Sequence, residues 1–264
     1  QNFPHSLGSF YSTFTEFCGF KPQSEEWKLM GASSYGQKSH YYKLIRDLVS
    51  INKENGFNLN LKYFNHYMFH RPHYYNDFLI DYLKIQPNVN GENLKERYFN
   101  IAFAAQRVFE EIYYHLINNL YKKSKSENLV LSGGCALNCL ANGKILTKSK
   151  FKNIFIPPVP DDSGAGLGAA YYVSNKILNS NKKYFITHNY FGPSFDNKQI
   201  SNKLKKFSIN FTSHKNILDL AVQSILSGKI IGWFQGSLEF GDRALGNRSI
   251  LADPRDPDMK DKIN

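Results

Sequence analysis

The sequence predicts an α/β fold, because two of its segments run from a short apolar strand through a glycine-containing turn into a helix. The first, residues 129–142, carries the adjacent glycines Gly133 and Gly134 after its strand. The second has a strand at 153–156, a proline-rich turn with two carboxylates, and a helix over 166–178. Glycines in such turns let backbone N–H groups approach an anion at the positive end of the next helix. Both turns therefore suit phosphate or metal chemistry.

The spacing of apolar residues predicts the other elements of the chain. Helices are expected over residues 5–20, 41–51, 100–121, 196–206 and 217–227, and strands at 57–63, 209–212 and 229–234. The polar residues 179–183 are typical of a linker, so we predict one domain over residues 1–180 and a second over residues 186–264.

The chain has 264 residues, with 33 Lys plus Arg against 22 Asp plus Glu and a net charge of +11. This charge would suit nucleic acid, an anionic membrane or a phosphorylated substrate. The lysines are scattered and the apolar runs are too short to cross a bilayer, so we expect neither a nucleic-acid nor a membrane partner. The three cysteines form no C-x-x-C pair, which favours a reducing, cytoplasmic location. Both ends are abrupt, so we expect a fragment of a longer protein.

Five blocks of sequence, taken in order, resemble one family. They are residues 4–8, 26–31, 132–138, 162–170 and 239–251. Together they are similar to the O-carbamoyltransferases of the NodU/CmcH type, which modify nodulation factors, cephamycins and aminoglycosides. The resemblance covers nearly the whole chain, and its last block, with Arg-Ala-Leu-Gly-Asn-Arg-Ser-Ile-Leu, is highly specific.

The resemblance implies an actin-like ATPase (ASKHA, TsaD-like) half-domain, followed by the truncated start of a YrdC-like α/β domain. The second domain would combine carbamoyl phosphate with ATP to give carbamoyl adenylate and pyrophosphate. The first would transfer the carbamoyl group to a hydroxyl of a small-molecule or glycan acceptor. A divalent metal of the Fe²⁺ type would lie in the first domain, and Mg²⁺ would accompany ATP. A homodimer is compatible with this picture, and the fragment alone is expected to be inactive.

Asp162 stands where the family has a carboxylate metal ligand, on a turn where it can bind a cation that also contacts phosphate. The alternative is that Asp161 or Asp162 only caps a helix. The family's other ligands, all histidines, lie upstream of this chain, which therefore does not complete the metal site. His66 and His70 have the spacing of two ligands on one helical face. Their position is wrong for the family and their neighbours are bulky aromatics, so we interpret them as surface or packing residues.

Gly133, Gly134 and Asn138 match the family's nucleotide-binding turn, and Gly164 is assigned to the same nucleotide. The glycines would approach phosphate, and the Asn138 amide would contact ribose or base. A plain strand-to-helix turn is the alternative. Cys135 is interpreted as a small buried residue and not as a nucleophile, because no histidine accompanies it.

Glu26 and Lys28 resemble a family segment near the nucleotide, where the carboxylate would accept from ribose hydroxyls and the ammonium would face phosphate. Glu25 stands where the family has glycine. An ordinary surface Glu–Lys pair is the alternative for this segment.

In the second domain, Arg243 and Arg248 are assigned to carbamoyl phosphate or ATP, since the guanidinium fork suits phosphate oxygens. Asp242 replaces a proline of the family, and a structural salt bridge is the alternative role for these arginines. No general base for the transfer can be named. His5 is the nearest candidate in the order of motifs, although a core histidine is the better interpretation.

Two other functions compete with carbamoyl transfer. One is a sugar-kinase-like phosphotransferase on an actin-like fold, since glycine turns alone do not distinguish the two chemistries. The other is a tRNA threonylcarbamoyladenosine-type transferase, for which the positive charge is the only independent support. The acceptor is set by variable loops, and one sequence does not identify it.

Overall fold

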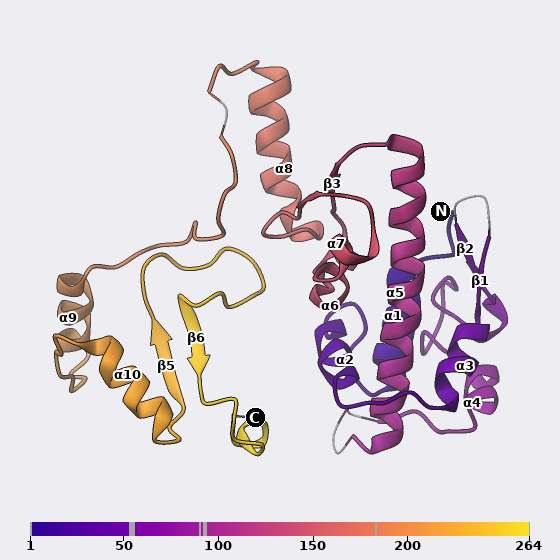
Figure 1. Cartoon of the computed structure of the whole chain (residues 1–264), viewed down its shortest axis with the longest axis horizontal. Coiled ribbons are helices and arrows are strands. Elements are labelled where there is room, and N and C mark those ends of the chain that lie inside the picture. Colours follow the sequence, from indigo (N-terminus) through magenta and orange to yellow (C-terminus); the bar gives the residue numbers. More distant parts are fainter. Residues whose placement is uncertain (1, 53–55, 90, 92–93, 183, 264) are drawn as a thin grey trace. The chain divides into compact units, whose positions relative to one another are not determined.

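The computed structural model describes residues 2–52, 56–89, 91, 94–182 and 184–263 (Figure 1). The chain separates into two compact units. Unit 1 comprises Gln1–Ile156 and Pro160–Asp162, and unit 2 comprises Pro157–Val159 and Ser163–Asn264. In the described part of the chain, no helix is both long enough and apolar enough to cross a membrane.

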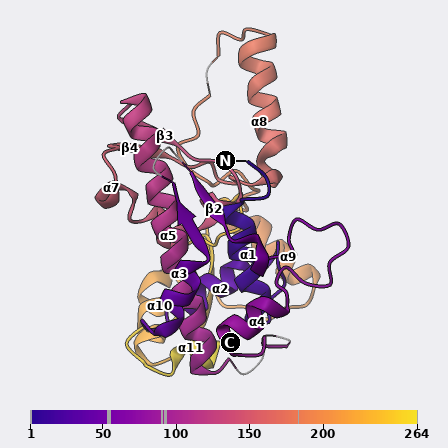
Figure 2. The ribbon, with the colours of Figure 1, turned by 90° about the vertical axis from the view of Figure 1, so that its right-hand side faces the viewer.

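Unit 1 is built around one long helix, α5 (Glu96–Ser124). Against it pack α1 (Leu7–Phe17), α2 (Glu26–Ser33) and α3 (His40–Asp47), as Figures 1 and 2 show. The face that α5 turns to the core repeats apolar residues three or four apart, as expected of an amphipathic helix. The fully buried side chains of this face include Ile101, Val108 and Ile112, and those of α1 include Phe10, Phe14 and Phe17.

Two small sheets complete unit 1. β1 (Val49–Ile51) pairs antiparallel with β2 (Phe57–Leu59), and η1 (Leu61–Tyr63) and α4 (Asp77–Leu83) follow. β3 (Asn128–Val130) pairs in parallel with β4 (Asn153–Phe155), so that Leu129 lies beside Ile154. Between these strands lie η2 (Gly134–Leu137), α6 (Cys139–Asn142) and α7 (Ile145–Lys148). Because β3 and β4 are parallel, the turns that follow them leave the same edge.

Unit 2 consists mainly of helices and one hairpin. Its elements are α8 (Ala165–Tyr172), which continues as the π-helical η4 (Val173–Ile177), then α9 (Asn197–Lys206), α10 (Ile217–Leu226), β5 (Ile231–Phe234), β6 (Arg248–Leu251) and α11 (Met259–Ile263). Asp196 begins α9 with a capping box to Gln199. β5 and β6 are antiparallel. The short helix η3 (Asp162–Gly164) leads from unit 1 into α8. The described residues of α8, α9 and α10 include no buried side chain.

The structure confirms the mixed α/β class and most of the expected elements. The helix expected over 41–51 is too long, because Val49–Ile51 leaves it to pair with β2. The strand expected over 57–63 ends at Leu59 and gives way to η1. Residues 209–212 form no strand, so this expectation is wrong. The actin-like assignment and the boundary between residues 180 and 186 stay predictions.

Candidate functional site

Unit 1 brings the two predicted turns together. The backbone N–H of Leu131 donates to Phe155 O at 3.0 Å, which extends the pairing of β3 and β4 by one step. Beyond it, the N–H of Gly133 donates to Pro160 O at 2.6 Å, and the Ser132 hydroxyl donates to the same oxygen at 3.0 Å. The glycine turn is therefore hydrogen-bonded to the residue that immediately precedes the two carboxylates of the second turn.

The glycine turn presents open backbone. Gly133 has a φ of 94°, which favours glycine, and a Cβ at Gly133 or at Gly134 would meet no atom within 4 Å. Gly134 begins η2, and the first N–H groups of a helix have no acceptor inside it. Exposed glycines beside helix-start donors are the arrangement that binds anions.

The block at residues 4–8 lies beside this turn. Ser6 caps α1 by accepting a hydrogen bond from Ser9 N at 3.2 Å. A Cβ built on Gly8 would lie 3.7 Å from Cys135 Sγ, so the start of α1 contacts η2. Burial raises the pKa of the Cys135 thiol to about 11, which disfavours a thiolate nucleophile at neutral pH.

His5 is held by the backbone. Its Nδ1 accepts a hydrogen bond from Leu59 N at 3.1 Å, which ties the start of the chain to β2. With Nδ1 as acceptor, a neutral ring carries its proton on Nε2. His5 is half-buried, so its interpretation as a core histidine stays a prediction, and the general base stays unassigned.

Asn138 lies beneath the glycine turn and is buried. Its Oδ1 accepts from Ala141 N at 3.0 Å and so caps α6. Its amide also exchanges hydrogen bonds with Gln106 on α5, at 3.1 Å and 2.9 Å. The structure thus places this side chain where it supports the turn, and direct contact with a ribose would require these bonds to break.

The segment at 25–28 is the start of α2. Glu26 Oε1 accepts from Ser12 Oγ at 2.5 Å and from Gln23 N at 2.6 Å. Lys28 Nζ donates to Glu25 Oε1 at 2.6 Å. Backbone donation from Lys21, followed by this ion pair, lowers the pKa of Glu25. The residue that departs from the family pattern is therefore the partner of Lys28, as in the surface Glu–Lys pair kept as the alternative.

Asp162 begins η3 and is exposed. Among the described residues there is no group of three or more His, Cys, Asp or Glu side chains that could hold a metal ion. Protein metal sites usually use at least three protein ligands. The donor set within the described part of the chain does not fit a complete metal site.

The histidines at 66, 70 and 73 are not on a helix. His66 is buried, its Nε2 bonds Pro4 O at 2.7 Å, and burial lowers its pKa. His73 Nδ1 pairs with Glu16 Oε1 at 3.0 Å. His70 lies edge-on to Phe69. These contacts agree with the interpretation as packing and surface residues.

In unit 2, Gly164 is needed for close backbone packing. A Cβ on this residue would lie 2.0 Å from Val159 O. No larger residue fits there unless the backbone moves. Gly164 therefore has a structural role at the turn before α8, and its predicted contact with nucleotide stays a prediction.

Arg248 belongs to a loop organised by Glu239. Glu239 is buried, and its Oε1 accepts from the backbone N–H groups of Leu245, Asn247 and Arg248 at 2.8, 2.8 and 3.1 Å. Burial alone would raise the pKa of Glu239, but these donors outweigh it and lower the pKa to about 2. The Arg248 side chain also pairs with Glu239 Oε2 at 3.4 Å, while Arg243 is exposed on the same loop. The arginine role therefore includes the structural pair kept as an alternative.

Two residues of these networks were not expected from the sequence, Gln106 and Glu239. Both are polar residues whose side chains are buried. For Gln106 a signal existed, because Glu110 follows it by one helical turn on the same face of α5 and is buried too.

Unit 1 contains an open glycine turn that is hydrogen-bonded to an acidic turn. Unit 2 contains a loop with Arg243 and Arg248, whose backbone donates to the buried Glu239 carboxylate. These features define an α/β protein with exposed turns that suit phosphate groups. Comparison with known families is more specific. The family model "Carbamoyltransferase N-terminus" matches residues 1–171, and "Carbamoyltransferase C-terminus" matches residues 222–264. The chain belongs to the carbamoyltransferase family.

Curated relatives support this assignment. An uncharacterized protein from Synechocystis sp. is 36% identical over 277 residues, covering 100% of this chain and 44% of the relative. Nodulation protein NolO from Bradyrhizobium diazoefficiens is 31% identical over 263 residues, covering 98% and 45%. The 3'-hydroxymethylcephem-O-carbamoyltransferase of Streptomyces clavuligerus is 31% identical over 138 residues, covering 52% and 25%. The chain spans less than half of the length of each of these relatives.

Proposed function

We propose that the protein transfers a carbamoyl group to a hydroxyl of a small-molecule or glycan acceptor. Carbamoyl phosphate, ATP and water would first give carbamoyl adenylate with release of pyrophosphate and inorganic phosphate, and AMP would leave when the carbamoyl group passes to the hydroxyl. The observation that carries the proposal is the hydrogen bond from Gly133 N to Pro160 O, which joins the two turns that the transfer site would use. Family membership supports the reaction class.

Some residues of this chain would bind the nucleotide, carbamoyl phosphate or the metal, and others would hold the binding turns in position. The missing side chains of Gly133 and Gly134 would leave room for the phosphate of the adenylate to reach the backbone N–H groups that begin η2, and Asn138 would keep the turn in shape through its hydrogen bonds to Gln106. Arg243 would bind carbamoyl phosphate or ATP in the second domain. Asp162 would be one ligand of a divalent metal, which would supply charge neutralisation when bound.

The test measures pyrophosphate. The complete protein in which this sequence occurs is incubated with ATP, with and without carbamoyl phosphate, and the proposal predicts pyrophosphate release only when both are present. Arg243→Ala should reduce the rate by about ten-fold or more, the value of one lost charge-assisted contact. Arg255→Ala is the matched control, because Arg255 is an exposed arginine of the same unit paired with Asp253.

Three outcomes would contradict the proposal. Pyrophosphate release without carbamoyl phosphate would remove the adenylate step. A phosphorylated sugar as product would indicate a phosphotransferase. Salt-sensitive tRNA binding with modification of the tRNA would indicate the threonylcarbamoyladenosine-type reaction.

A further inference from the structure

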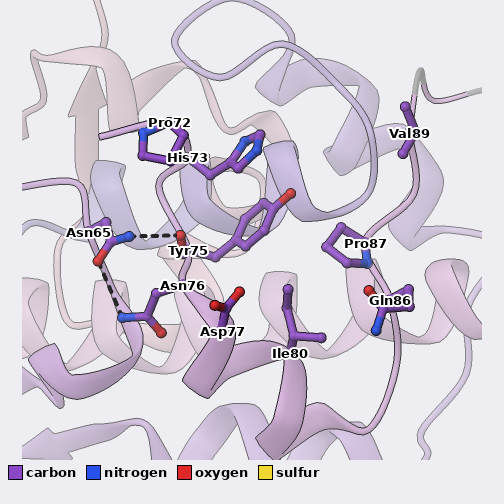
Figure 3. Close-up of a pocket in the computed structure, with 10 residues that line it drawn as sticks. All are labelled: Asn65, Pro72, His73, Tyr75, Asn76, Asp77, Ile80, Gln86, Pro87 and Val89. Carbon is purple, nitrogen blue, oxygen red and sulfur yellow. Dashed lines mark hydrogen bonds between the residues drawn. The ribbon is translucent and has the colours of Figure 1, made fainter. Parts of the chain in front are cut away.

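Unit 1 contains a pocket of about 500 Å³ that none of the sequence motifs predicts. Figure 3 shows it between two stretches of chain, residues 72–80 and residues 86–89. His73 and Tyr75 stand on the first side, with Asp77 below Tyr75 in this view, and Gln86 and Pro87 stand on the second side. A concave site of this volume is in the range of small-molecule pockets.

The first wall is fixed to helix α1. Glu16, near the end of α1, accepts a hydrogen bond from Tyr74 N at 2.6 Å and pairs with His73 Nδ1 at 3.0 Å. The His73 and Tyr75 rings are stacked, with centroids 4.9 Å apart and an interplanar angle of 4°. This wall therefore presents ordered aromatic groups that do not have to form when a ligand arrives.

The base of this wall is fixed by two asparagines. Asn65 Nδ2 donates to Tyr75 O at 3.1 Å, and Asn76 Nδ2 donates to Asn65 Oδ1 at 3.3 Å. Asn76 Oδ1 in turn accepts from Leu79 N at 3.3 Å and caps α4. The polar atoms of both asparagines are used inside the protein, so they support the pocket and do not select its ligand.

The second wall is fixed to helices α1 and α5. The Tyr98 hydroxyl donates to Gln86 O at 2.9 Å, and Asn88 N donates to Phe17 O at 3.0 Å. With both walls fixed to core helices, the pocket is formed before a ligand binds, which lowers the entropic cost of binding.

The groups left to contact a ligand are of mixed character. The Asp77 carboxylate, the Gln86 side-chain amide and the Tyr75 hydroxyl make no hydrogen bond to another described residue, and they offer both donors and acceptors. Ile80 and Pro87 supply apolar surface. Among the described residues that line the pocket there is no lysine or arginine, so phosphate and nucleotides are poor candidates.

We propose that this pocket binds a neutral carbohydrate, one or two sugar units in size. A sugar has hydroxyls that donate and accept at the same time and apolar C–H faces that pack on rings, which matches the lining. An ammonium ligand could use the Asp77 carboxylate, but it accepts no hydrogen bond, so the donors of Gln86 and Tyr75 would lose water without compensation.

The pocket and the glycine turn are at opposite ends of α1. The start of α1 contacts Cys135, and Glu16 and Phe17 near its end hold the pocket. α1 has 11 residues, which at 1.5 Å per residue is roughly 16 Å. We therefore assign the pocket to a remote sugar unit of a glycan acceptor. The assignment to an acceptor rests on the proposed function. The proposal that the pocket binds a carbohydrate does not depend on that function.

The test measures binding by the full chain. The chain is applied to an array of neutral oligosaccharides, and the strongest ligand is then titrated by calorimetry, with spermidine and inorganic phosphate as cationic and anionic probes. Binding of at least one neutral oligosaccharide is expected, together with no binding of either charged probe. Absence of carbohydrate binding on the array, or spermidine binding that depends on Asp77, would overturn the proposal.

Variants then locate the bound sugar. Asp77→Ala and Gln86→Ala should each weaken binding by about ten-fold, as expected for a lost hydrogen bond to a charged or polar group. Asp81→Ala is the matched control, because Asp81 is an exposed carboxylate of the same helix that does not line the pocket. Tyr75→Phe keeps the ring and removes only the hydroxyl.

Equal affinity in wild type and in all three pocket variants would overturn the proposal. The outcome is separable from that of the proposed function, because no step of this experiment uses carbamoyl transfer. The chain could bind a sugar while the complete protein releases no pyrophosphate. This result would support the pocket as a carbohydrate site and would contradict only its assignment to a glycan acceptor of carbamoyl transfer.

Discussion

The side-chain amides of Gln106 and Asn138 form a reciprocal pair of hydrogen bonds, at 3.1 Å and 2.9 Å, between the long helix α5 and the residue that caps the end of η2. Gln106 Oε1 also accepts from the Tyr11 hydroxyl at 2.7 Å, and its Nε2 also contacts Glu110 at 3.1 Å. Lys144 donates to both oxygens of Glu110. The glycine turn thus rests on a buried polar network whose members are mutually satisfied.

The first prediction concerns this network. Gln106→Leu leaves the Asn138 Nδ2 group and the Tyr11 hydroxyl buried without the acceptor they have in Gln106, and it should lower the free energy of unfolding by about 2–4 kcal/mol. Urea unfolding followed by circular dichroism measures the change. Gln37→Leu, an exposed glutamine of the same unit, should cost less than about 0.5 kcal/mol. Equal effects of the two substitutions would show that the buried network contributes nothing specific.

A second prediction separates the two glycines of the turn. Gly133→Ala places a side chain at a φ of 94° and should destabilise unit 1 by about 1–3 kcal/mol. Gly134→Ala has no such strain and would meet no atom within 4 Å, so it should leave stability nearly unchanged. It should nevertheless weaken ATP binding by about ten-fold, because the added methyl keeps phosphate from the backbone.

Calorimetric titration with ATP, beside thermal unfolding of the same variants, measures both effects. If Gly134→Ala binds ATP as tightly as the unsubstituted chain, then the open backbone of this turn is not where the nucleotide lies.

A third prediction uses another pair of glycines. Gly164→Ala would bring a Cβ to 2.0 Å from Val159 O, and it should lower stability by about 1–3 kcal/mol because backbone must move. Gly166→Ala, within α8, meets no atom within 4 Å and should stabilise the helix by about 1 kcal/mol. Thermal unfolding of both variants checks the two signs. A neutral result for Gly164→Ala would contradict the close packing at this turn.

The fourth prediction is a pH dependence in unit 2. The pKa of Glu239 is lowered from 4.5 to about 2, so its stabilising hydrogen bonds are present above 4.5 and are lost as the pH falls through about 2. The amide resonances of Leu245 and Asn247 should therefore titrate with a midpoint near pH 2 in nuclear magnetic resonance spectra.

Glu239→Gln should abolish this titration, while Asp219→Asn, an exposed carboxylate on α10, should leave it in place. A midpoint at the ordinary value of 4.5 would mean that the backbone donors do not hold the carboxylate.

The local sequence pattern predicted the elements that form without pairing to a distant segment of the chain. The apolar spacing of α5 and the capping residues of α9 lie within each helix or next to it, where the sequence alone shows them. Both helices form as expected. Val49–Ile51 was assigned to a helix because its strand depends on pairing with Phe57–Leu59, which no local window contains. Residues 209–212 look apolar enough for a strand, yet they have no partner strand among the described residues.

The candidate site was predictable to the same extent. The glycine turn and the acidic turn could be found from composition, and their meeting follows from the parallel pairing of β3 with β4. The sequence could not predict that the Asn138 side chain is buried, because its hydrogen-bond partner Gln106 lies 32 residues away in the sequence. Likewise, the sequence does not show that Lys28 pairs with Glu25. Nor does it show that the Glu239 carboxylate accepts hydrogen bonds from the backbone of its loop, because both contacts depend on distances in the folded chain.

The two hydrogen-bonded turns of unit 1 are proposed to form one nucleotide site. Hydrogen exchange of the complete protein, followed by mass spectrometry with and without ATP, tests this most directly. We predict that residues 132–138 and residues 160–162 become protected together when ATP binds. Protection confined to residues 239–251, or to neither turn, would contradict the account.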